Sequence, residues 1–171
     1  VGYIVGTFNL ILRTEDGGKN WTPILENTDN PQGFHLNAIS QVGDEVFIVG
    51  EQGIVLKLDR ASQRFIAVPT DYTGTFFGMT GKPGLVLVYG LRGNVYRSTD
   101  AGASWGKVEI ALPVSIAAAS VDASGGIYLL SQAGHVLLST DDGLSFVLRE
   151  QEPLAPVSGA TATSNNQLVV V

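Results

Sequence analysis

Two histidines and two pairs of glycines are the residues of this 171-residue chain whose types most directly suggest chemistry. A histidine can bind a metal ion or transfer a proton, but His35 and His135 have no acid or cysteine at ligand spacing, and the chain contains no cysteine. The glycines of "GEQG" (50–53) and "GLRG" (90–93) would need a following helix to hold a phosphate group, and no helical pattern follows them. We therefore interpret both pairs as tight turns and predict no catalytic residue, no metal site and no cofactor in this segment.

Arginine is the other residue type with clear binding chemistry, because a guanidinium group donates two parallel hydrogen bonds to a carboxylate. A site that works in this way needs several arginines at one place. Only Arg92 lies in a short turn between two strands, whereas the other five flank polar corners of the chain or follow one: Arg13, Arg60, Arg64, Arg97 and Arg149. The sequence therefore predicts no convergent set of arginines here.

The composition narrows the classes of function. The formal net charge is −6 and the ten basic residues are scattered, which argues against nucleic acid as a partner because phosphate binding needs clustered lysine and arginine. No apolar run approaches the ~18 residues of a membrane-spanning helix, so we predict no membrane span in this segment. With 21 glycines and only 15% charged residues, the chain is suited to many short strands and tight turns.

A polar corner that ends in an aromatic residue occurs three times, as "RTEDGGKNW" (13–21), "RSTDAGASW" (97–105) and "LSTDDGLSF" (138–146). A fourth copy, "LDRASQRF" (58–65), has lost its glycine and its aligned acid. The closing aromatics Trp21, Phe65, Trp105 and Phe146 are 44, 40 and 41 residues apart. A period of this length indicates a repeat architecture in which each repeat is one structural unit.

Each repeat shares a plan of four short strands. One apolar strand leads into a small turn, a second leads into the corner, a third follows the corner, and a fourth with small residues, such as "SIAAAS" (115–120), precedes the next unit. Four strands in about 40 residues are typical of a β-propeller blade, whose innermost strand has the least space. We predict an all-β fold of four-stranded antiparallel blades, about four of which are present.

The strand plan also predicts the blade boundaries. With strands named A to D from the innermost outward, the chain starts with B, C and D, continues with three complete blades, and finishes with A and B. Both partial blades supply a B strand, so we expect the chain to be part of a longer one that forms a ring of about six to eight blades. The predicted boundaries are 1–33, 34–74, 75–114, 115–157 and 158–171.

The residues of the corner, between strands C and D, are expected to be structural. The aspartate can accept hydrogen bonds from backbone N–H groups two or three residues further on, the serine or threonine before it offers a second local bond, and the glycine can adopt a positive φ. The closing aromatic is expected to pack into the hydrophobic layer. The residues in these roles are Thr14, Asp16, Gly18 and Trp21; Ser98, Asp100, Gly102 and Trp105; and Ser139, Asp141, Gly143 and Phe146.

The corner pattern S/T-x-D-x-G-x-x-W/F resembles the Asp-box, also called the bacterial neuraminidase repeat. The fuller form from Gly90 to Trp105 is similar to the propellers of the photosystem II stability/assembly factor family and its relatives in non-photosynthetic bacteria. This resemblance covers the whole chain. It implies a periplasmic or secreted, non-catalytic scaffold that holds a protein partner, and it points to a membrane protein complex as the source of that partner.

Asp-boxes also occur in sialidases, which implies a second hypothesis. These glycoside hydrolases need three convergent arginines, a nucleophilic tyrosine and an acid. The arginine-isoleucine-proline signature near their start is absent from this chain. The alternative is therefore a sialidase-like propeller with a carbohydrate ligand, whose catalytic residues lie largely outside this segment.

The predicted binding surface is the face that carries the B–C turns and the D–A connections. Aromatic residues and arginine dominate the energetics of protein interfaces. Arg92 is the one arginine expected there, beside acids such as Glu26, Asp29 and Glu152, so the face differs from the arginine-rich patch that the resemblance implies for photosynthetic members. The residues predicted to bind a partner are Phe8, Phe34, Asp71, Tyr72, Phe76 and Arg92.

Overall fold

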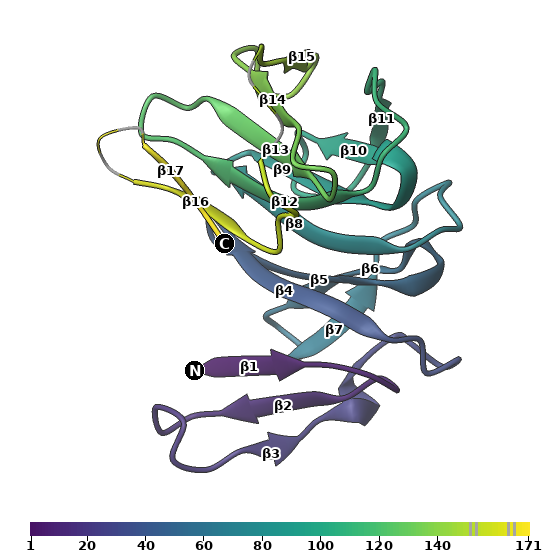
Figure 1. The fold of residues 1–171 in the computed structure, drawn as a ribbon. Coiled ribbons are helices and arrows are strands. Elements are labelled where there is room, and N and C mark those ends of the chain that lie inside the picture. Colours follow the sequence, from purple (N-terminus) through teal and green to yellow (C-terminus); the bar gives the residue numbers. More distant parts are fainter. Residues whose placement is uncertain (151, 153, 164, 166) are drawn as a thin grey trace.

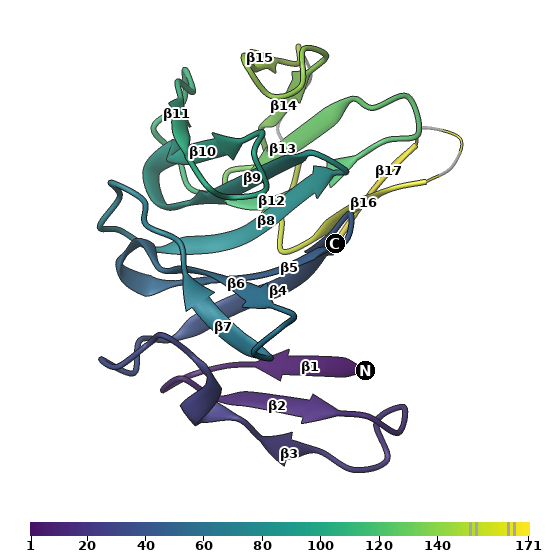
Figure 2. The same ribbon diagram turned by 180° about the vertical axis from the view of Figure 1, so that it is seen from behind.

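The computed structural model describes residues 1–150, 152, 154–163, 165 and 167–171. In these residues the sheets are antiparallel, and each strand pairs with the strand that precedes or follows it in the chain. Figures 1 and 2 show the sheets following one another around the molecule, from the purple sheet at the N-terminus to the yellow strands at the C-terminus. This is the arrangement of β-propeller blades, so the predicted fold class is confirmed.

Three of the sheets have four strands, paired in the order in which they occur in the chain. The innermost strand of each is strand A of the predicted plan and the outermost is strand D. From A to D these sheets are β4 (Leu36–Val42), β5 (Glu45–Gly50), β6 (Val55–Asp59) and β7 (Arg64–Ala67); β8 (Phe76–Lys82), β9 (Leu85–Gly90), β10 (Val95–Ser98) and β11 (Gly106–Val108); and β12 (Ile116–Val121), β13 (Ile127–Ser131), β14 (Val136–Ser139) and β15 (Val147–Leu148).

Two smaller sheets flank these three. The first has three strands, and its β1 holds the place of strand B because it leads through a short turn and a second strand into a corner, as β5 and β9 do. The last has two strands, which follow the third complete sheet along the chain. Their strands are β1 (Gly2–Val5), β2 (Ile11–Thr14) and β3 (Thr22–Pro23), and then β16 (Ala160–Ala162) and β17 (Leu168–Val170).

The A strands β4, β8, β12 and β16 lie next to one another on the inner side of the molecule (Figure 1). Each complete A strand has a register shift after its first residue, between Leu36 and Ala38 in β4 and between Phe76 and Gly78 in β8. At Gly78 the small residue after the shift leaves room for the side chain of Tyr89 in the adjacent strand β9.

The hydrophobic core consists of layers between successive sheets. Aliphatic and aromatic side chains from strands A, B and C fill each layer, because alternate residues of a strand point to opposite faces of its sheet. The layer between the second and third sheets contains the buried residues Val42, Phe47, Val49, Val55, Phe76, Met79, Val86, Val88 and Tyr96.

Helical structure in the described residues is limited to single 3-10 turns. Two of them are the glycine-flanked turns of the B–C connections, in which the N–H of Ile54 donates to the carbonyl of Glu51 and the N–H of Asn94 donates to the carbonyl of Leu91. No helix in this described part of the chain is long and apolar enough to cross a membrane. The turns are η1 (Leu25–Asn27), η2 (Glu51–Gly53) and η3 (Leu91–Gly93).

Candidate functional site

The loops at one end of the sheets form a continuous surface, which we call the loop face. It consists of the B–C turns 6–10, 50–54, 90–94 and 131–135 and the D–A connections 27–35, 68–75 and 109–115. Each connection packs against the turn of the sheet that it leaves. A Cβ atom on Gly53 would lie 1.8 Å from the carbonyl oxygen of Tyr72, so this turn residue must be glycine for the connection to pack so closely.

The connections also reach the turn of the following sheet. The N–H of Glu51 donates to the carbonyl of His35 at 3.1 Å, and the N–H of Gln132 donates to the carbonyl of Ser115 at 2.9 Å. Each connection therefore joins two successive turns. The loop face is held by backbone hydrogen bonds that do not depend on the side chains it exposes.

The tip residues of the first three turns have a left-handed backbone, with φ of 54° at Phe8, 54° at Gln52 and 55° at Arg92, and Asn9 next to Phe8 shares it with φ of 58°. A non-glycine residue in this conformation costs about 1–2 kcal/mol, and such local strain is concentrated at functional sites. All three tip residues are exposed, and the exposed fraction of Phe8 is 76%. The turns thus display a large side chain from each of the first three sheets on the loop face.

The first cluster on this face is formed by Phe8, His35 and Glu51. The rings of Phe8 and His35 meet edge-on, with their centroids 4.7 Å apart. Nδ1 of His35 lies 3.6 Å from Oε1 of Glu51, and the backbone N–H of His35 donates to Oε2 of the same carboxylate at 2.9 Å. The predicted residue Phe34 is half-buried next to His35 in the chain.

Sequence reasoning missed a polar network that involves the neighbours of Phe8 and Phe34. Nδ2 of Asn9 donates to Oγ1 of Thr28 at 2.9 Å, and Nδ2 of Asn30 donates to Oδ1 of Asn9 at 3.0 Å. Oδ1 of Asn30 also accepts the backbone N–H of Phe34 at 3.1 Å, and Asn30 is buried. Because a buried amide is costly without partners, this network fixes the 27–35 connection against the first turn.

The second cluster brings together three predicted residues, Asp71, Tyr72 and Arg92. The ring of Tyr72 packs 4.8 Å from that of Phe76 and 5.6 Å from that of Tyr96. Burial raises the pKa of Tyr72, and the nearby charge of Arg92 lowers it by a smaller amount. Burial and a hydrogen bond to the carboxylate of Asp71 raise the pKa of Tyr96 to about 12. The tyrosine hydroxyl therefore stays protonated and donates to Asp71.

Phe76 does not lie on the loop face, which corrects one predicted site residue. Its side chain is fully buried in β8, and its ring lies 5.8 Å from that of Tyr96. In each of the three complete sheets the first residue of strand A points into the core in the same way, as the burial of Leu36 and Ile116 shows. Phe76 supports Tyr72 from below and is not available to a partner.

The corners join strands C and D at the end of the sheets that is opposite to the loop face, and they share one geometry. Oγ of Ser98 donates to Oδ1 of Asp100 at 2.8 Å and accepts the N–H of Gly102, also at 2.8 Å. Asp100 accepts the N–H of Ser104 at 2.9 Å, four residues further on, where two or three were expected. Bonds from the Ser104 side chain and backbone lower the pKa of Asp100 to about 2.

The other two corners repeat these bonds. The hydroxyl of Ser139 or Thr14 donates to the aspartate and accepts a glycine N–H, and the aspartate accepts a backbone N–H four residues on. Asp16 also accepts the N–H of Lys19 at 3.0 Å, three residues on, as expected. The glycines have the positive φ that was expected, 88° at Gly18, 85° at Gly102 and 75° at Gly143. The residues that correspond to Ser98, Asp100 and Ser104 are Thr14, Asp16 and Asn20, and Ser139, Asp141 and Ser145.

The closing aromatics differ in burial. Phe146 is buried and Trp105 packs against the core layer that contains Phe47. Trp21 is 37% exposed, so the expectation that it packs into a hydrophobic layer is wrong. Later corners pack against strand B of the preceding sheet, and no described sheet precedes the one that holds Trp21. Its indole N–H instead donates to the carbonyl of Gly18 at 3.1 Å.

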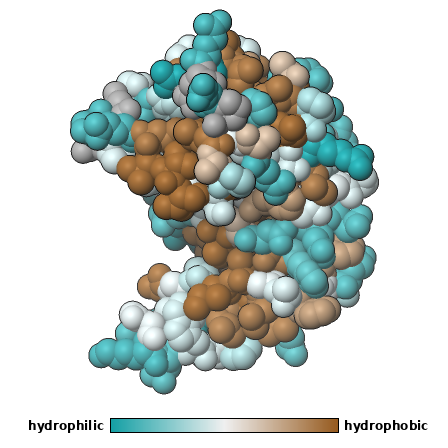
Figure 3. Space-filling view, viewed as in Figure 1, coloured by the Kyte–Doolittle hydropathy of each residue, from teal (hydrophilic) through white to brown (hydrophobic). Residues whose placement is uncertain are grey.

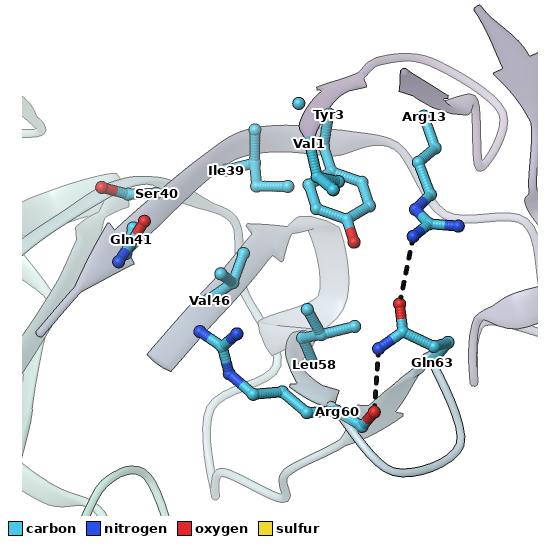
Figure 4. A pocket seen from close by; sticks show the side chains of 11 residues that line it. Val1, Tyr3, Arg13, Ile39, Ser40, Gln41, Val46, Leu58, Arg60 and Gln63 are labelled. Carbon is cyan, nitrogen blue, oxygen red and sulfur yellow. Dashed lines mark hydrogen bonds between the residues drawn. The ribbon is translucent and has the colours of Figure 1, made fainter. Parts of the chain in front are cut away.

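Four of the arginines each contact a partner of their own, and two of these four, Arg13 and Arg60, line the same pocket (Figure 4). Arg64 pairs with Asp29 at 3.5 Å, and Nε of Arg97 donates to the carbonyl of Asp142 at 2.6 Å. Among the arginines, Arg92 alone projects from a tip of the loop face.

In the described residues, no group of three or more histidine, cysteine, aspartate or glutamate side chains is placed to hold a metal ion.

The profile of the family described as photosynthesis system II assembly factor YCF48 matches residues 1–111. The photosystem II assembly lipoprotein Ycf48 of Synechococcus sp. (strain CC9902) is 27% identical over 112 residues, which cover 61% of this chain and 32% of that protein. The chloroplastic photosystem II stability/assembly factor HCF136 of Oryza sativa subsp. japonica is 26% identical over 110 residues, covering 61% of this chain and 26% of that protein. The chain thus spans about a third or less of the length of these relatives.

Solved structures share the fold. YCF48 bound to a D1 peptide superposes with a TM-score of 0.75 at 20% identity, covering 99% of this chain and 56% of that one. A virginiamycin B lyase from Staphylococcus aureus superposes with a TM-score of 0.78 at 16% identity, covering 96% of this chain and 56% of the lyase. At these identities the likeness shows the propeller fold alone. Because the family profile matches well over half of its residues, the chain belongs to the photosynthesis system II assembly factor YCF48 family.

Proposed function

We propose that this chain is a non-catalytic binding propeller of an exported bacterial protein, and that it holds a protein partner from a membrane complex on its loop face. The observation that carries this proposal is membership of the assembly factor family. Two similar proteins support its finer parts. A relative from Synechococcus is called an assembly lipoprotein, and a solved YCF48 structure is described as bound to a D1 peptide.

The loop face has the chemistry of a protein-binding surface. Phe8, Gln52 and Arg92 project from its turns, and aromatic residues and arginine are the types that contribute most to interface affinity. Their backbones are fixed by the turns before any partner arrives, so little conformational entropy is lost there on binding. We propose that Phe8 and Arg92 are the contacts that contribute most, with Asp71 and Tyr72 beside Arg92.

A pull-down from native membranes tests the proposal. The bait is the chain itself, compared with the double variant Phe8→Ser/Arg92→Glu. We expect the wild-type chain to retain a membrane protein and the double variant to retain at least tenfold less of it, because both changes remove exposed contacts and leave the core intact.

A matched control is the double variant Val147→Ser/Lys107→Glu, which makes the same kinds of change at exposed positions of the outer strands β15 and β11. It should retain the partner as the wild type does. Equal loss in both variants, or no specific membrane protein in any sample, would count against the loop face. Turnover of a sialoside by the full-length protein would instead support the glycoside hydrolase hypothesis.

A further inference from the structure

The outer edge of the second sheet is covered by a segment of the connection that precedes it. Thr28 forms a parallel bridge with Phe65 of β7, and the N–H of Asp29 donates to the carbonyl of Phe65 at 2.9 Å. The carboxylate of Asp29 accepts the N–H of Ala67 at 3.3 Å and lies 3.5 Å from a terminal nitrogen of Arg64. The chain thus shows what binds beside an outer strand: an extended segment that runs parallel to it and carries an acid.

The outer edge of the third sheet has no such cover in the described residues. β11 pairs with β10 on one side, and no segment pairs with it on the other. The counterpart of the covering segment is the connection 68–75, but this connection bonds to the turn of its own sheet, where Oγ1 of Thr70 donates to the carbonyl of Gly53 at 3.1 Å. The edge of β11 is therefore open although the second and third sheets and the connection between them are complete.

A glycine enlarges the space beside this open edge. Trp105 and Phe65 close equivalent corners, so Gly106 takes the place that Ile66 has in β7. A Cβ atom on Gly106 would lie 4.0 Å from the carbonyl oxygen of Arg97 and near no other heavy atom, and its φ is not positive. Neither packing nor backbone conformation requires glycine here, and a glycine within a strand can mark the close approach of a ligand.

The space over Gly106 belongs to a pocket between the third and fourth sheets. It encloses about 240 Å³, and Val108 and Leu144 form its apolar side. Arg97 lines it, whereas the side chain of Lys107 points to the other face of the sheet, because alternate residues of a strand point to opposite faces. The described lining includes no aspartate or glutamate. In Figure 3 hydrophobic and hydrophilic residues both reach the surface at the upper end of the molecule, where Figure 1 places β11 and β15.

The corner of the fourth sheet holds Arg97 in place. Nε of Arg97 donates to the carbonyl of Asp142 at 2.6 Å, and the second sheet contacts the third in the same way, through Nζ of Lys57 and the carbonyl of Ala101 at 2.9 Å. The carboxylate of Asp142 pairs with Lys82 at 2.6 Å. In the part of the chain that the structure describes, the terminal nitrogens of Arg97 have no hydrogen-bond or ion-pair partner. They are therefore available to a ligand in the pocket.

A segment bound to β11 in the register seen on β7 would bring an acid to Arg97. In that register Asp29 lies beside Ile66, so one side chain of the added segment would lie beside Gly106. Because Gly106 has no side chain, a carboxylate there can reach across β11 to Arg97, the residue that pairs with Gly106 in β10. The N–H of Lys107 has the position of the N–H that Asp29 accepts on β7. Hydrogen bonds between a carboxylate and a guanidinium group are strong.

We propose that the open edge of β11 and the pocket over Gly106 bind an extended segment of a partner polypeptide. The segment runs parallel to β11, and one of its acidic side chains lies over Gly106 and binds the guanidinium group of Arg97. This site lies on the outer rim of the sheets and is separate from the loop face, so the proposal does not depend on the function proposed for that face.

The test uses the full-length protein and a peptide with the sequence of residues 24–31, acetylated and amidated so that Glu26 and Asp29 supply its only charges. Amide hydrogen exchange of the protein is followed by NMR as the peptide is added, and we expect exchange at Lys107 to slow on binding. Asparagine in place of Asp29 in the peptide should weaken binding at least tenfold. Glutamine in place of Glu26 removes the same charge and should change nothing, because on β7 only the main-chain carbonyl of Glu26 is used, by Arg64.

Two protein variants take their new residue from the second sheet. Gly106→Ile fills the pocket with the residue that β7 has at this place. Arg97→Lys keeps the contact with the next corner that Lys57 makes, but it removes the terminal nitrogens of the guanidinium group. Each variant should bind the peptide at least tenfold more weakly, while its amide spectrum outside the site stays that of the wild type.

Slow exchange at Lys107 before any peptide is added would overturn the proposal, because the protein itself would then cover the edge. No binding, equal binding of the two substituted peptides, or undiminished binding to Gly106→Ile would equally overturn it, as would slowing at the turns of the loop face in place of Lys107. Slowing at Lys107 that depends on protein concentration alone would assign the edge to a second copy of the protein.

Discussion

The ring of Phe65 meets the ring of Tyr3 edge-on, with 5.4 Å between their centroids and 88° between their planes. Phe65 closes the corner of the second sheet, and Tyr3 lies in strand B of the first. The next corners repeat this contact: a Cβ atom on Gly102 would lie 2.8 Å from Cε1 of Phe47, and Leu87 is as close to Gly143. Each of these three corners therefore rests on strand B of the preceding sheet and holds two sheets together.

This contact predicts that two chemically identical substitutions differ in cost. Trp105→Ala should lower the free energy of unfolding by about 2–4 kcal/mol, because Trp105 packs on the layer that contains Phe47. Trp21→Ala should cost this chain about 1 kcal/mol or less, because the Trp21 side chain is 37% exposed. Urea denaturation of both variants measures the difference. Equal losses would show that the corner aromatics act within their own sheet.

A pair of glycine substitutions separates backbone strain from packing. Gly17→Ala places a side chain at φ 76° with no heavy atom within 4 Å, so it should cost about 1–2 kcal/mol from the left-handed backbone alone. Gly102→Ala has φ 85° and also forces its Cβ to within 2.8 Å of Phe47, which should add about 1–3 kcal/mol. Adding Phe47→Leu to Gly102→Ala should cost less than the sum of the single changes, as a double-mutant cycle by urea denaturation would measure.

The aspartates of the corners predict sensitivity to acid. Hydrogen bonds lower the pKa values of Asp16, Asp100 and Asp141 from 3.8 to about 2, mainly bonds from Asn20, Ser104 and Ser145. A lowered pKa in the folded state gives stability that is present above pH 4 and is lost as the pH falls towards 2. The melting temperature should therefore fall over this window. Asp100→Asn should be less stable at pH 7 and lose less on acidification; an acid response equal to that of the wild type would exclude this role for Asp100.

The repeats made the fold predictable. The polar corners recur at a regular spacing and each has its glycine or its aromatic in register, so the sequence predicts a series of antiparallel sheets. The serine, aspartate and glycine of each corner interact within a few residues of one another, and local bonds of this kind can be inferred from sequence. The burial of Trp21 could not be inferred in this way, because it depends on contact with a neighbouring sheet.

The loop face was less predictable for the same reason. Phe8 and Arg92 could be placed on it because their turns are short and bounded by recognisable strands. Phe76 was misplaced by one strand boundary, since the first residue of β8 points into the core. Asn30 and Tyr96 were missed because their partners, Asn9 and Asp71, are 21 and 25 residues away and no local pattern connects them.

Tyr89 gives a prediction at alkaline pH. Burial is the main cause that raises its pKa from 10.0 to about 12, and Gly78 leaves the space that its hydroxyl group occupies. A tyrosine that ionises later in the folded than in the unfolded state contributes stability below pH 10, and this stability is lost as the pH rises towards 12. The wild-type melting temperature should fall over that interval, with Tyr96 contributing to the fall.

Tyr89→Phe removes the ionisable group but keeps the ring. The melting temperature of this variant should therefore change less between pH 10 and 12, while its free energy of unfolding at pH 8 stays within about 1 kcal/mol of the wild type. If the melting temperature of Tyr89→Phe falls as steeply as that of the wild type, Tyr89 ionises as readily in the folded state as in the unfolded state, and the space above Gly78 is open to water.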